Sequence, residues 1–261
     1  MEQKLFEIWS KDSSEYIENG PTLETFLIDS DKALGAVIVL PGGAYRALAE
    51  HEAGCVAKAF NEQGFHAFVL KYRVAPNRFP APQLDVWQSI RIIRENANKW
   101  NVNPDMIAVL GFSAGGHLAA SSAVLYKEVN DFANDKSGYP NALILCYPVI
   151  SFDVIGHRGS ADNLLGEEID VNTRKKYSLD TRVDLDTPPA FLWHTATDAG
   201  VPVENSIVFA KELWKRGISA ELHVFPLGPH GVGLAKDRND VKVWPTLAGN
   251  FLKTTVKFSA K

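Results

Sequence analysis

Short apolar runs that alternate with longer amphipathic segments are the feature of this 261-residue sequence that most restricts its fold. The runs are rich in β-branched and aromatic residues, as strands are, and the segments between them have the apolar spacing of surface helices. This alternation is typical of an α/β protein with a mostly parallel sheet and helices on both faces. It predicts strands at residues 4–9, 23–28, 35–40, 66–72, 106–111, 142–148, 190–195 and 220–226, and helices at 52–63, 83–100, 115–126, 203–217 and 241–255.

The domain organisation predicted from the sequence is a single domain over residues 1–261, because no repeat, low-complexity tract or linker interrupts the pattern. One irregular segment lies at about residues 151–188, between two predicted strands, and contains Gly, Pro and mixed charge. An insertion of this length commonly covers a site, so we expect a short cap there.

Composition and charge restrict the partners. The net charge is −4, and the 27 Lys and Arg residues are interspersed with 31 Asp and Glu residues without a basic block, which argues against a nucleic-acid or anionic-membrane partner. No signal peptide or bilayer-length apolar run is visible. Cys55 and Cys146 lie in apolar surroundings, as free buried thiols do. We therefore expect a cytoplasmic protein with a small-molecule ligand, and the sequence leaves a homo-oligomer open.

The motif Gly-Phe-Ser113-Ala-Gly stands where a predicted strand becomes a helix. Glycines on both sides of a serine allow a sharp turn that exposes its hydroxyl at the carboxyl edge of the sheet. The following helix directs its positive N-terminal end and free N–H groups at the same point. A chance turn of glycine and serine or a phosphate-binding loop is the alternative, and the motif lacks the Gly-Lys-Ser/Thr ending of a phosphate-binding loop. The pattern therefore predicts that Ser113 is a nucleophile.

A serine hydroxyl needs a base that is itself oriented by a third group, and the chain order supplies candidates. Asp198 lies in a loop after the predicted strand 190–195, and His230 lies in a glycine-rich loop after the strand 220–226. Ser, Asp, His is the chain order of hydrolases whose serine lies on a sharp strand-to-helix turn, called the elbow. Asp153, just after the strand 142–148, is the rival for the acid. We predict Ser113, Asp198 and His230 as the catalytic residues.

The remaining histidines and acidic residues have structural interpretations. His194 and His223 fall within strands, His117 in a helix, His66 at the start of a strand and His157 in the insertion. His51 and Glu52 are expected to open the following helix. They lack the second histidine of a His-Glu-x-x-His zinc site, so we predict no metal. The triad chemistry predicted above implies no cofactor.

The turn after the strand 35–40 is the predicted second half of an oxyanion hole. Its backbone N–H groups at Gly43 and Ala44 can lie beside the turn at Ser113 and join the N–H of Ala114, and the sequence leaves open which of Gly43 and Ala44 donates. An N–H donor at position 44 tolerates the methyl group of alanine, which a glycine would lack, if the φ of Ala44 stays negative. Tyr45 and Arg46 follow directly, and we expect both to contact the leaving group of the substrate. We expect the Ala44 methyl group and the Tyr45 ring to narrow the space beside the oxyanion hole.

These motifs together resemble the α/β-hydrolase superfamily, in particular the esterase/lipase branch with bacterial acetylesterases and acetyl-xylan-esterase-like enzymes. The resemblance covers residues 35–233 and includes "PGGAYRALAEHE", "GFSAGGHLAA", "HTATDAGVPVENS" and "GPHGVG". It departs from the common His-Gly-Gly-Gly motif at Pro41 and Ala44. It also implies that Arg73 and Asp85 pair and fix a loop to the next helix.

The function predicted from these residues is a serine carboxylic ester hydrolase that acts through an acyl-enzyme on short-acyl, acetyl-type esters, with a sugar ester suggested by the resemblance. Two alternatives stay open. The same triad serves an amidase or peptidase such as an arylformamidase-like enzyme, and the fold also has non-catalytic binding members. The polar insertion is too short for the broad apolar lid of a long-chain lipase.

Overall fold

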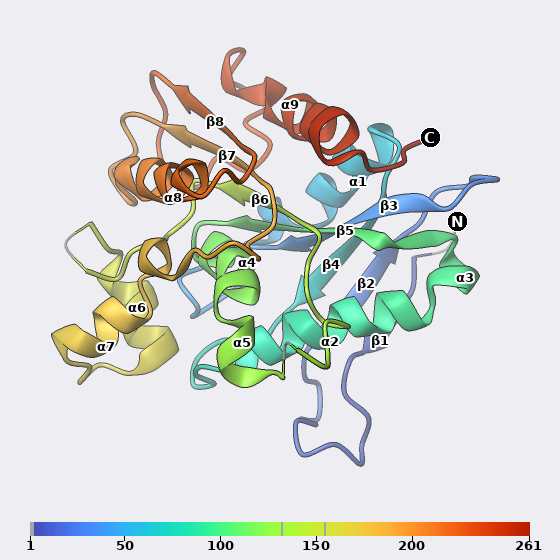
Figure 1. The fold of residues 1–261 in the computed structure, drawn as a ribbon, viewed down its shortest axis with the longest axis horizontal. Helices are drawn as coiled ribbons and strands as arrows, with labels where there is room; N and C mark the ends of the chain where they lie inside the picture. The colour runs from blue at the N-terminus through green and yellow to red at the C-terminus, as the bar shows by residue number, and fades with distance from the viewer. Residues whose placement is uncertain (1–2, 132, 154) are drawn as a thin grey trace.

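The computed structural model describes residues 3–131, 133–153 and 155–261; residues 1, 2, 132 and 154, which the predicted domain and insertion include, lie outside this description. Its centre is an eight-stranded sheet of order β1-β2-β4-β3-β5-β6-β7-β8 (Figure 1). The pairs from β4 across to β8 are parallel, and the pairs β1–β2 and β2–β4 are antiparallel. All eight predicted strands are present: β1 (Leu5–Glu7), β2 (Thr22–Phe26), β3 (Leu34–Leu40), β4 (His66–Lys71), β5 (Val102–Phe112), β6 (Ala142–Cys146), β7 (Ala190–Thr195) and β8 (Ala220–Phe225). The predicted mostly parallel α/β sheet is confirmed.

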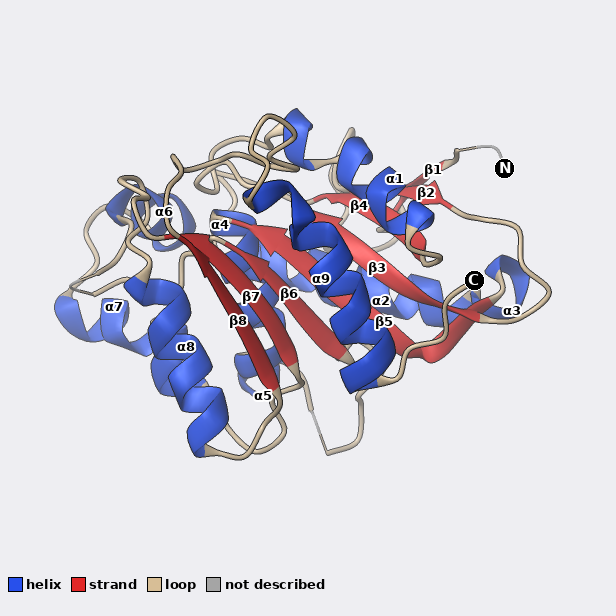
Figure 2. Cartoon of the chain, turned by 90° about the horizontal axis from the view of Figure 1, so that it is seen from above, coloured by secondary structure: helices blue, strands red, loops and turns tan. Residues whose placement is uncertain are grey.

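Helices cover both faces of this sheet (Figure 2). One face carries α2 (Ala81–Glu95), α4 (Ala114–Val124) and α8 (Glu204–Lys215), and the other carries α1 (Gly54–Glu62) and α9 (Trp244–Phe251). The central strands are buried on both sides. Their alternate residues pack into two hydrophobic cores, one on each face of the sheet. In β3, Ala36, Ile38 and Leu40 belong to the first core, whereas Val37 and Val39 belong to the second.

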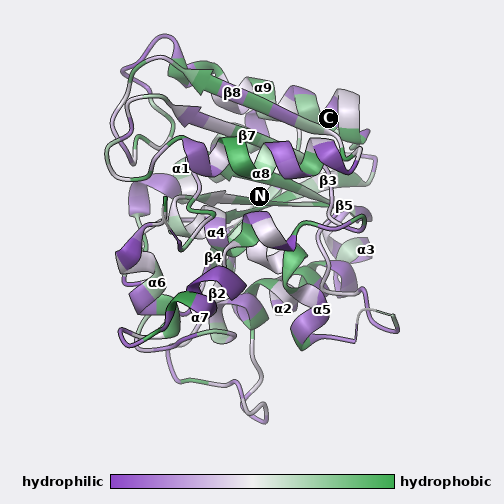
Figure 3. Ribbon diagram, turned by 60° about the vertical axis from the view of Figure 1, so that its left-hand side comes forward, coloured by the Kyte–Doolittle hydropathy of each residue, from purple (hydrophilic) through white to green (hydrophobic). Residues whose placement is uncertain are grey.

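The helix α8 contacts the sheet through one face, whereas α4 is buried on all sides. In α8, Phe209, Ala210 and Leu213 are buried, whereas Trp214 is 50% exposed. Figure 3 shows the result as alternating hydrophilic and hydrophobic bands along α8. This 3.6-residue periodicity is the physical basis of the sequence prediction for this segment.

The predicted helices at residues 83–100 and 115–126 are each divided in the structure. The first consists of α2 and α3 (Ala97–Trp100), which meet at Asn96 (φ −97°, ψ 10°). The second consists of α4 and α5 (Tyr126–Val129), which meet at Leu125 (φ −108°, ψ 3°). These backbone angles leave the helical range, and apolar spacing alone does not register such a break.

The insertion between β6 and β7 is more regular than expected. It contains α6 (Arg158–Leu165), α7 (Val171–Lys176) and a 3₁₀ turn at Leu179–Arg182. Side chains cap both helices, since His157 accepts from the N–H of Ser160 and Asp170 accepts from the N–H of Thr173. In Figures 1 and 2, α6 and α7 lie at the end of the molecule opposite the chain termini. Within the described ranges, no helix combines the length and apolar character needed to span a bilayer.

Candidate active site

Ser113 occupies a strained turn between β5 and α4. Its backbone has φ 52° and ψ −117°, in the left-handed half of conformational space that residues with a side chain rarely adopt. Glycines make the turn possible: a Cβ on Gly111 would lie 2.0 Å from the carbonyl oxygen of Gly115, and one on Gly115 would lie 2.3 Å from that of Leu40. The Ser113 N–H donates to the Cys146 carbonyl at 3.0 Å, which ties the elbow to β6. Such strain is characteristic of functional positions.

The three predicted catalytic side chains meet at the carboxyl ends of the parallel strands. Ser113 Oγ lies 2.7 Å from His230 Nε2, and His230 Nδ1 lies 2.7 Å from Asp198 Oδ2. The carboxylate accepts from Nδ1–H, so Nε2 is left as the acceptor for the serine proton. The His230 side chain is 26% exposed and the Asp198 side chain is fully buried. A ligand can therefore reach the histidine while the acid is shielded from water.

Asp198 is held on several sides at once. Its Oδ1 accepts from the N–H groups of Gly200 at 2.8 Å and Val201 at 2.9 Å, and its Oδ2 also lies 3.4 Å from His194 Nε2. Burial favours the neutral acid, but hydrogen bonds from His194, His230 and Val201 outweigh it, and the pKa of Asp198 falls well below its usual range. The carboxylate is thus ionised throughout the neutral range.

His194 is a site residue that the sequence analysis assigned only to packing. Its Nδ1 lies 2.8 Å from Ser206 Oγ, and its Nε2 lies 3.0 Å from the Val201 carbonyl. A carbonyl can only accept, so Nε2 carries the proton and Nδ1 accepts from the Ser206 hydroxyl. The ring is buried in β7 and supports Asp198 from the side away from the triad histidine. Its position four residues before Asp198 was the available signal.

Asp153, the rival acid, makes no hydrogen bond or ion pair to His230 in the described part of the chain. Its N–H donates to Ser151 Oγ at 3.1 Å. Asp198 alone of the two carboxylates contacts the histidine.

The predicted oxyanion loop lies against the elbow. A Cβ on Gly42 would come within 3.0 Å of the Phe112 carbonyl oxygen and 3.2 Å of Ser113 Cβ. The Gly42 N–H donates to the buried carboxylate of Glu52 at 2.8 Å and is unavailable to a substrate. Across residues 3–131, 133–153 and 155–261, the N–H groups of Gly43, Ala44 and Ala114 donate no hydrogen bond. Unsatisfied donors of this kind are what an oxyanion hole requires.

The backbone at Ala44 does not meet the condition of a negative φ under which a methyl group is tolerated there without strain. Its φ is +55°, not negative, and the next residue, Tyr45, has φ +57°. Two successive left-handed residues carry strain that a glycine at position 44 would avoid. The segment is held by hydrogen bonds to its carbonyl groups: Tyr72 Oη to Pro41 at 2.6 Å, Asn163 Nδ2 to Ala44 at 2.8 Å, and the Ala75 N–H to Tyr45 at 2.7 Å.

The two predicted substrate contacts have different outcomes. Tyr45 is fully buried, and its hydroxyl lies 2.9 Å from His117 Nδ1. The expectation that its ring contacts the substrate is wrong, because the left-handed backbone turns this side chain into the core. Arg46 is exposed, and its side chain makes no hydrogen bond or ion pair to any described residue.

The pair implied by the resemblance is present. Arg73 Nε donates to both oxygens of Asp85, at 2.9 and 3.0 Å, and its Nη1 lies 2.8 Å from Glu15. Asp85 also accepts from Trp9 Nε1 at 2.8 Å. These contacts join α2 to the loop after β4 and to the N-terminal segment.

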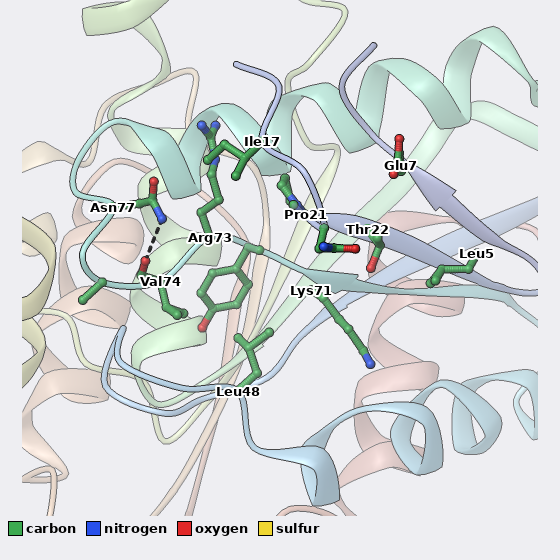
Figure 4. A pocket seen from close by; sticks show the side chains of 14 residues that line it. Leu5, Glu7, Ile17, Pro21, Thr22, Leu48, Lys71, Arg73, Val74 and Asn77 are labelled. Atoms are coloured by element: carbon green, nitrogen blue, oxygen red, sulfur yellow. Dashed lines mark hydrogen bonds between the residues drawn. The ribbon is translucent and has the colours of Figure 1, made fainter. Parts of the chain in front are cut away.

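A cavity of about 590 Å³ lies beside β1, β2 and the end of β4 (Figure 4). Its lining includes Leu48, Lys71 and Asn77, but none of the three triad residues. The described residues contain no group of three or more His, Cys, Asp or Glu side chains arranged to hold a metal ion.

The parallel sheet, its covering helices and the strand–serine–helix turn with Asp198 and His230 at neighbouring strand ends define an α/β-hydrolase. Comparison with protein families narrows this class. The chain belongs to the BD-FAE family, whose model matches residues 27–213.

Individual relatives agree with this assignment. The chain is 37% identical over 225 residues to endo-1,4-beta-xylanase B of Butyrivibrio fibrisolvens and 36% identical over 205 residues to an acetylxylan esterase of Xylanibacter ruminicola. The matches cover 83% and 76% of this chain but only 35% and 41% of those proteins. The crystal structure of an acetyl ester-xyloside bifunctional hydrolase from Caldicellulosiruptor lactoaceticus superposes with a TM-score of 0.89 at 40% identity, over 98% of this chain and 97% of that one.

Proposed function

We propose that this protein is a serine carboxylic ester hydrolase that removes short acyl groups, acetyl above all, from small esters. The observation that carries the proposal is the continuous hydrogen-bonded line from Ser113 Oγ through His230 to Asp198, with both links at 2.7 Å. The line joins side chains from three segments of the chain that are far apart in sequence. It is the arrangement that activates a serine hydroxyl.

The reaction begins when Ser113 Oγ attacks the ester carbonyl carbon and His230 Nε2 takes the hydroxyl proton. The buried Asp198 carboxylate stabilises the imidazolium that forms. The free N–H groups of Gly43, Ala44 and Ala114 are the proposed donors to the oxyanion. Collapse of this intermediate expels the alcohol, which receives the proton from Nε2. A water molecule, deprotonated by the same nitrogen, then attacks the acyl-enzyme, and the acid leaves with Ser113 restored.

A sugar acetate is the proposed natural substrate class. The relatives named as an acetylxylan esterase and as an acetyl ester-xyloside hydrolase support the acetyl group and the sugar alcohol. The exposed Arg46 guanidinium, without a partner among the described residues, is the proposed contact for hydroxyl groups of the leaving sugar. A cytoplasmic location and a homo-oligomer stay predictions.

The test compares an aryl acetate, an aryl acetamide and an acetylated xylo-oligosaccharide as substrates of the wild type and of Ser113→Ala. We expect hydrolysis of both acetate esters by the wild type only. Cleavage of the acetamide at a rate above that of the ester would favour the amidase alternative. No cleavage of any substrate would favour a binding protein.

A further inference from the structure

Glu52 is a buried carboxylate close to the active site that the proposed reaction does not use. The residue is 2% exposed and ends the 3₁₀ turn Glu50–Glu52, which follows the oxyanion loop. Its Oε2 accepts from the Gly42 N–H at 2.8 Å, and its Oε1 accepts from the Tyr147 hydroxyl at 2.5 Å. Among the described residues, no lysine or arginine pairs with Glu52, and His51 Nε2 lies 3.7 Å from its Oε1. A buried acidic side chain in such surroundings is uncommon and costly, which points to a specific role.

Tyr147 extends this contact to the loop of the catalytic histidine. Its hydroxyl accepts from the Gly233 N–H at 2.8 Å, so its single proton is free to be donated to Glu52. Its ring packs edge-on against His230 with centroids 5.1 Å apart. Tyr147 has φ +36°, the strained backbone expected where function fixes a side chain.

We propose that Glu52 is a positioning residue that, through Tyr147, fixes the oxyanion loop and the His230 loop relative to each other. One carboxylate oxygen holds Gly42, which lies against the elbow, and the other holds the hydroxyl that anchors Gly233. The inference rests on the proposed serine hydrolase function. Its physical basis is that small displacements of an oxyanion donor or a general base lower the rate of a reaction steeply.

Only a carboxylate satisfies both neighbours. Glutamine has the same shape, but its amide offers one acceptor and one donor group. If the amide oxygen faces the Gly42 N–H, the NH₂ group faces Tyr147, and the tyrosine hydroxyl proton loses its acceptor. If the amide is reversed, NH₂ opposes the Gly42 N–H. Each orientation leaves one buried donor unsatisfied.

The experiment measures the rate at which a fluorophosphonate labels Ser113, together with aryl acetate kinetics and thermal unfolding. The variants are Glu52→Gln, Tyr147→Phe, the double variant, and Glu50→Gln as the matched control. Glu50 lies on the same 3₁₀ turn with an 81% exposed side chain. We expect Glu52→Gln and Tyr147→Phe each to lower the labelling rate and kcat about tenfold with little change in KM. Glu50→Gln should match the wild type.

A double-mutant cycle separates positioning from general stability. If Glu52 and Tyr147 act through the same hydrogen bond, the labelling rate and kcat of the double variant fall by a much smaller factor than the product of the two single-variant factors. Labelling and kcat at wild-type levels in folded Glu52→Gln and Tyr147→Phe, or losses that multiply, would overturn the inference. If Glu52→Gln does not fold, Tyr147→Phe alone decides through its labelling rate. A wild type whose Ser113 neither reacts with the probe nor hydrolyses esters overturns the proposed function itself, and the inference with it.

Discussion

Asn163, in the first helix of the insertion, donates a hydrogen bond of 2.8 Å to the carbonyl oxygen of Ala44 in the oxyanion loop. The contact joins residues 119 positions apart in sequence. It places α6 directly on the segment that we propose stabilises the oxyanion. The insertion therefore supports the active site through a defined hydrogen bond.

Asn163→Ala tests this connection. We expect kcat for an aryl acetate to fall about fivefold, the equivalent of one net hydrogen bond of about 1 kcal/mol, because the strained Ala44–Tyr45 backbone loses a tether. Steady-state kinetics with Asn172→Ala, on the exposed helix α7, provides the control. Unchanged kinetics in Asn163→Ala would mean that the loop is rigid without the insertion.

Replacing the nucleophile is the most direct test of the site. Ser113→Ala should lower hydrolysis by about 10⁴- to 10⁶-fold, because no other group supplies the attacking oxygen. The thermal unfolding midpoint should change little, since among the described residues the Ser113 side chain bonds to His230 alone and Ala retains its Cβ. Activity within tenfold of the wild type would contradict the assignment.

Asp198→Asn should lower kcat by about 10⁴-fold, because an amide can stabilise the wrong imidazole tautomer and cannot balance an imidazolium charge. Asp153→Asn is the matched control, and we expect it to lose far less. The reverse ranking of these two variants in the same assay would transfer the role of the acid to Asp153.

Acyl chain length gives a test of the substrate class. We expect kcat/KM for aryl esters to be highest from acetyl to butyryl and to fall strongly by octanoyl, since each poorly accommodated methylene costs about 1–3 kcal/mol. The Ala44 methyl group is the remaining basis for a narrow site, because the Tyr45 ring is buried. Ala44→Gly should therefore broaden the chain-length profile. A wild-type profile that rises through octanoyl would exclude the short-acyl proposal.

The stability of the protein should depend on pH through His117. Burial lowers the pKa of this imidazole from its ordinary 6.5 to about 3, so the folded state resists a proton that the unfolded state accepts. The contribution of His117 to the free energy of unfolding is fully present above the pKa of the unfolded state. It is lost as pH falls below about 6.5, by about 1.4 kcal/mol per pH unit for one proton.

Urea unfolding at pH 7 and pH 5 measures this effect. The free energy of unfolding should change less between the two pH values in His117→Asn than in the wild type. His66 and His157, whose pKa values burial also lowers, are present in both proteins and do not affect the difference. Equal slopes would contradict the assignment to His117.

The strands and the position of Ser113 were predictable from local sequence, and the candidates Asp198 and His230 were predictable from chain order. A continuous apolar run such as residues 35–40 is typical of a strand that is buried on both faces of a parallel sheet. Gly111 and Gly115 permit the sharp turn at Ser113 through their own backbone freedom. Chain order then brought Asp198 and His230 to neighbouring strand ends, since parallel strands share one carboxyl edge. The two helices of the insertion were not predicted: α7 buries none of its residues and so lacks an amphipathic pattern, and α6 is eight residues long and buries Ser160, Ala161 and Leu164, of which only the last is a large apolar residue.

The sequence by itself determined the α/β sheet and identified Ser113 and His230 as candidates for nucleophile and base, with Asp198 preferred to Asp153 as the acid, because periodicity and turn chemistry act over a few residues. Only the tertiary structure decided that Ala44 and Tyr45 adopt left-handed backbone conformations and that the Tyr45 hydroxyl contacts His117. It also decided that Glu52 links Gly42 to Tyr147 through hydrogen bonds. These outcomes depend on contacts between segments far apart in the chain. Glu52 and Tyr147, for example, are separated by 95 positions, and the free energy that fixes them comes from satisfying buried donors and acceptors that no local pattern reveals.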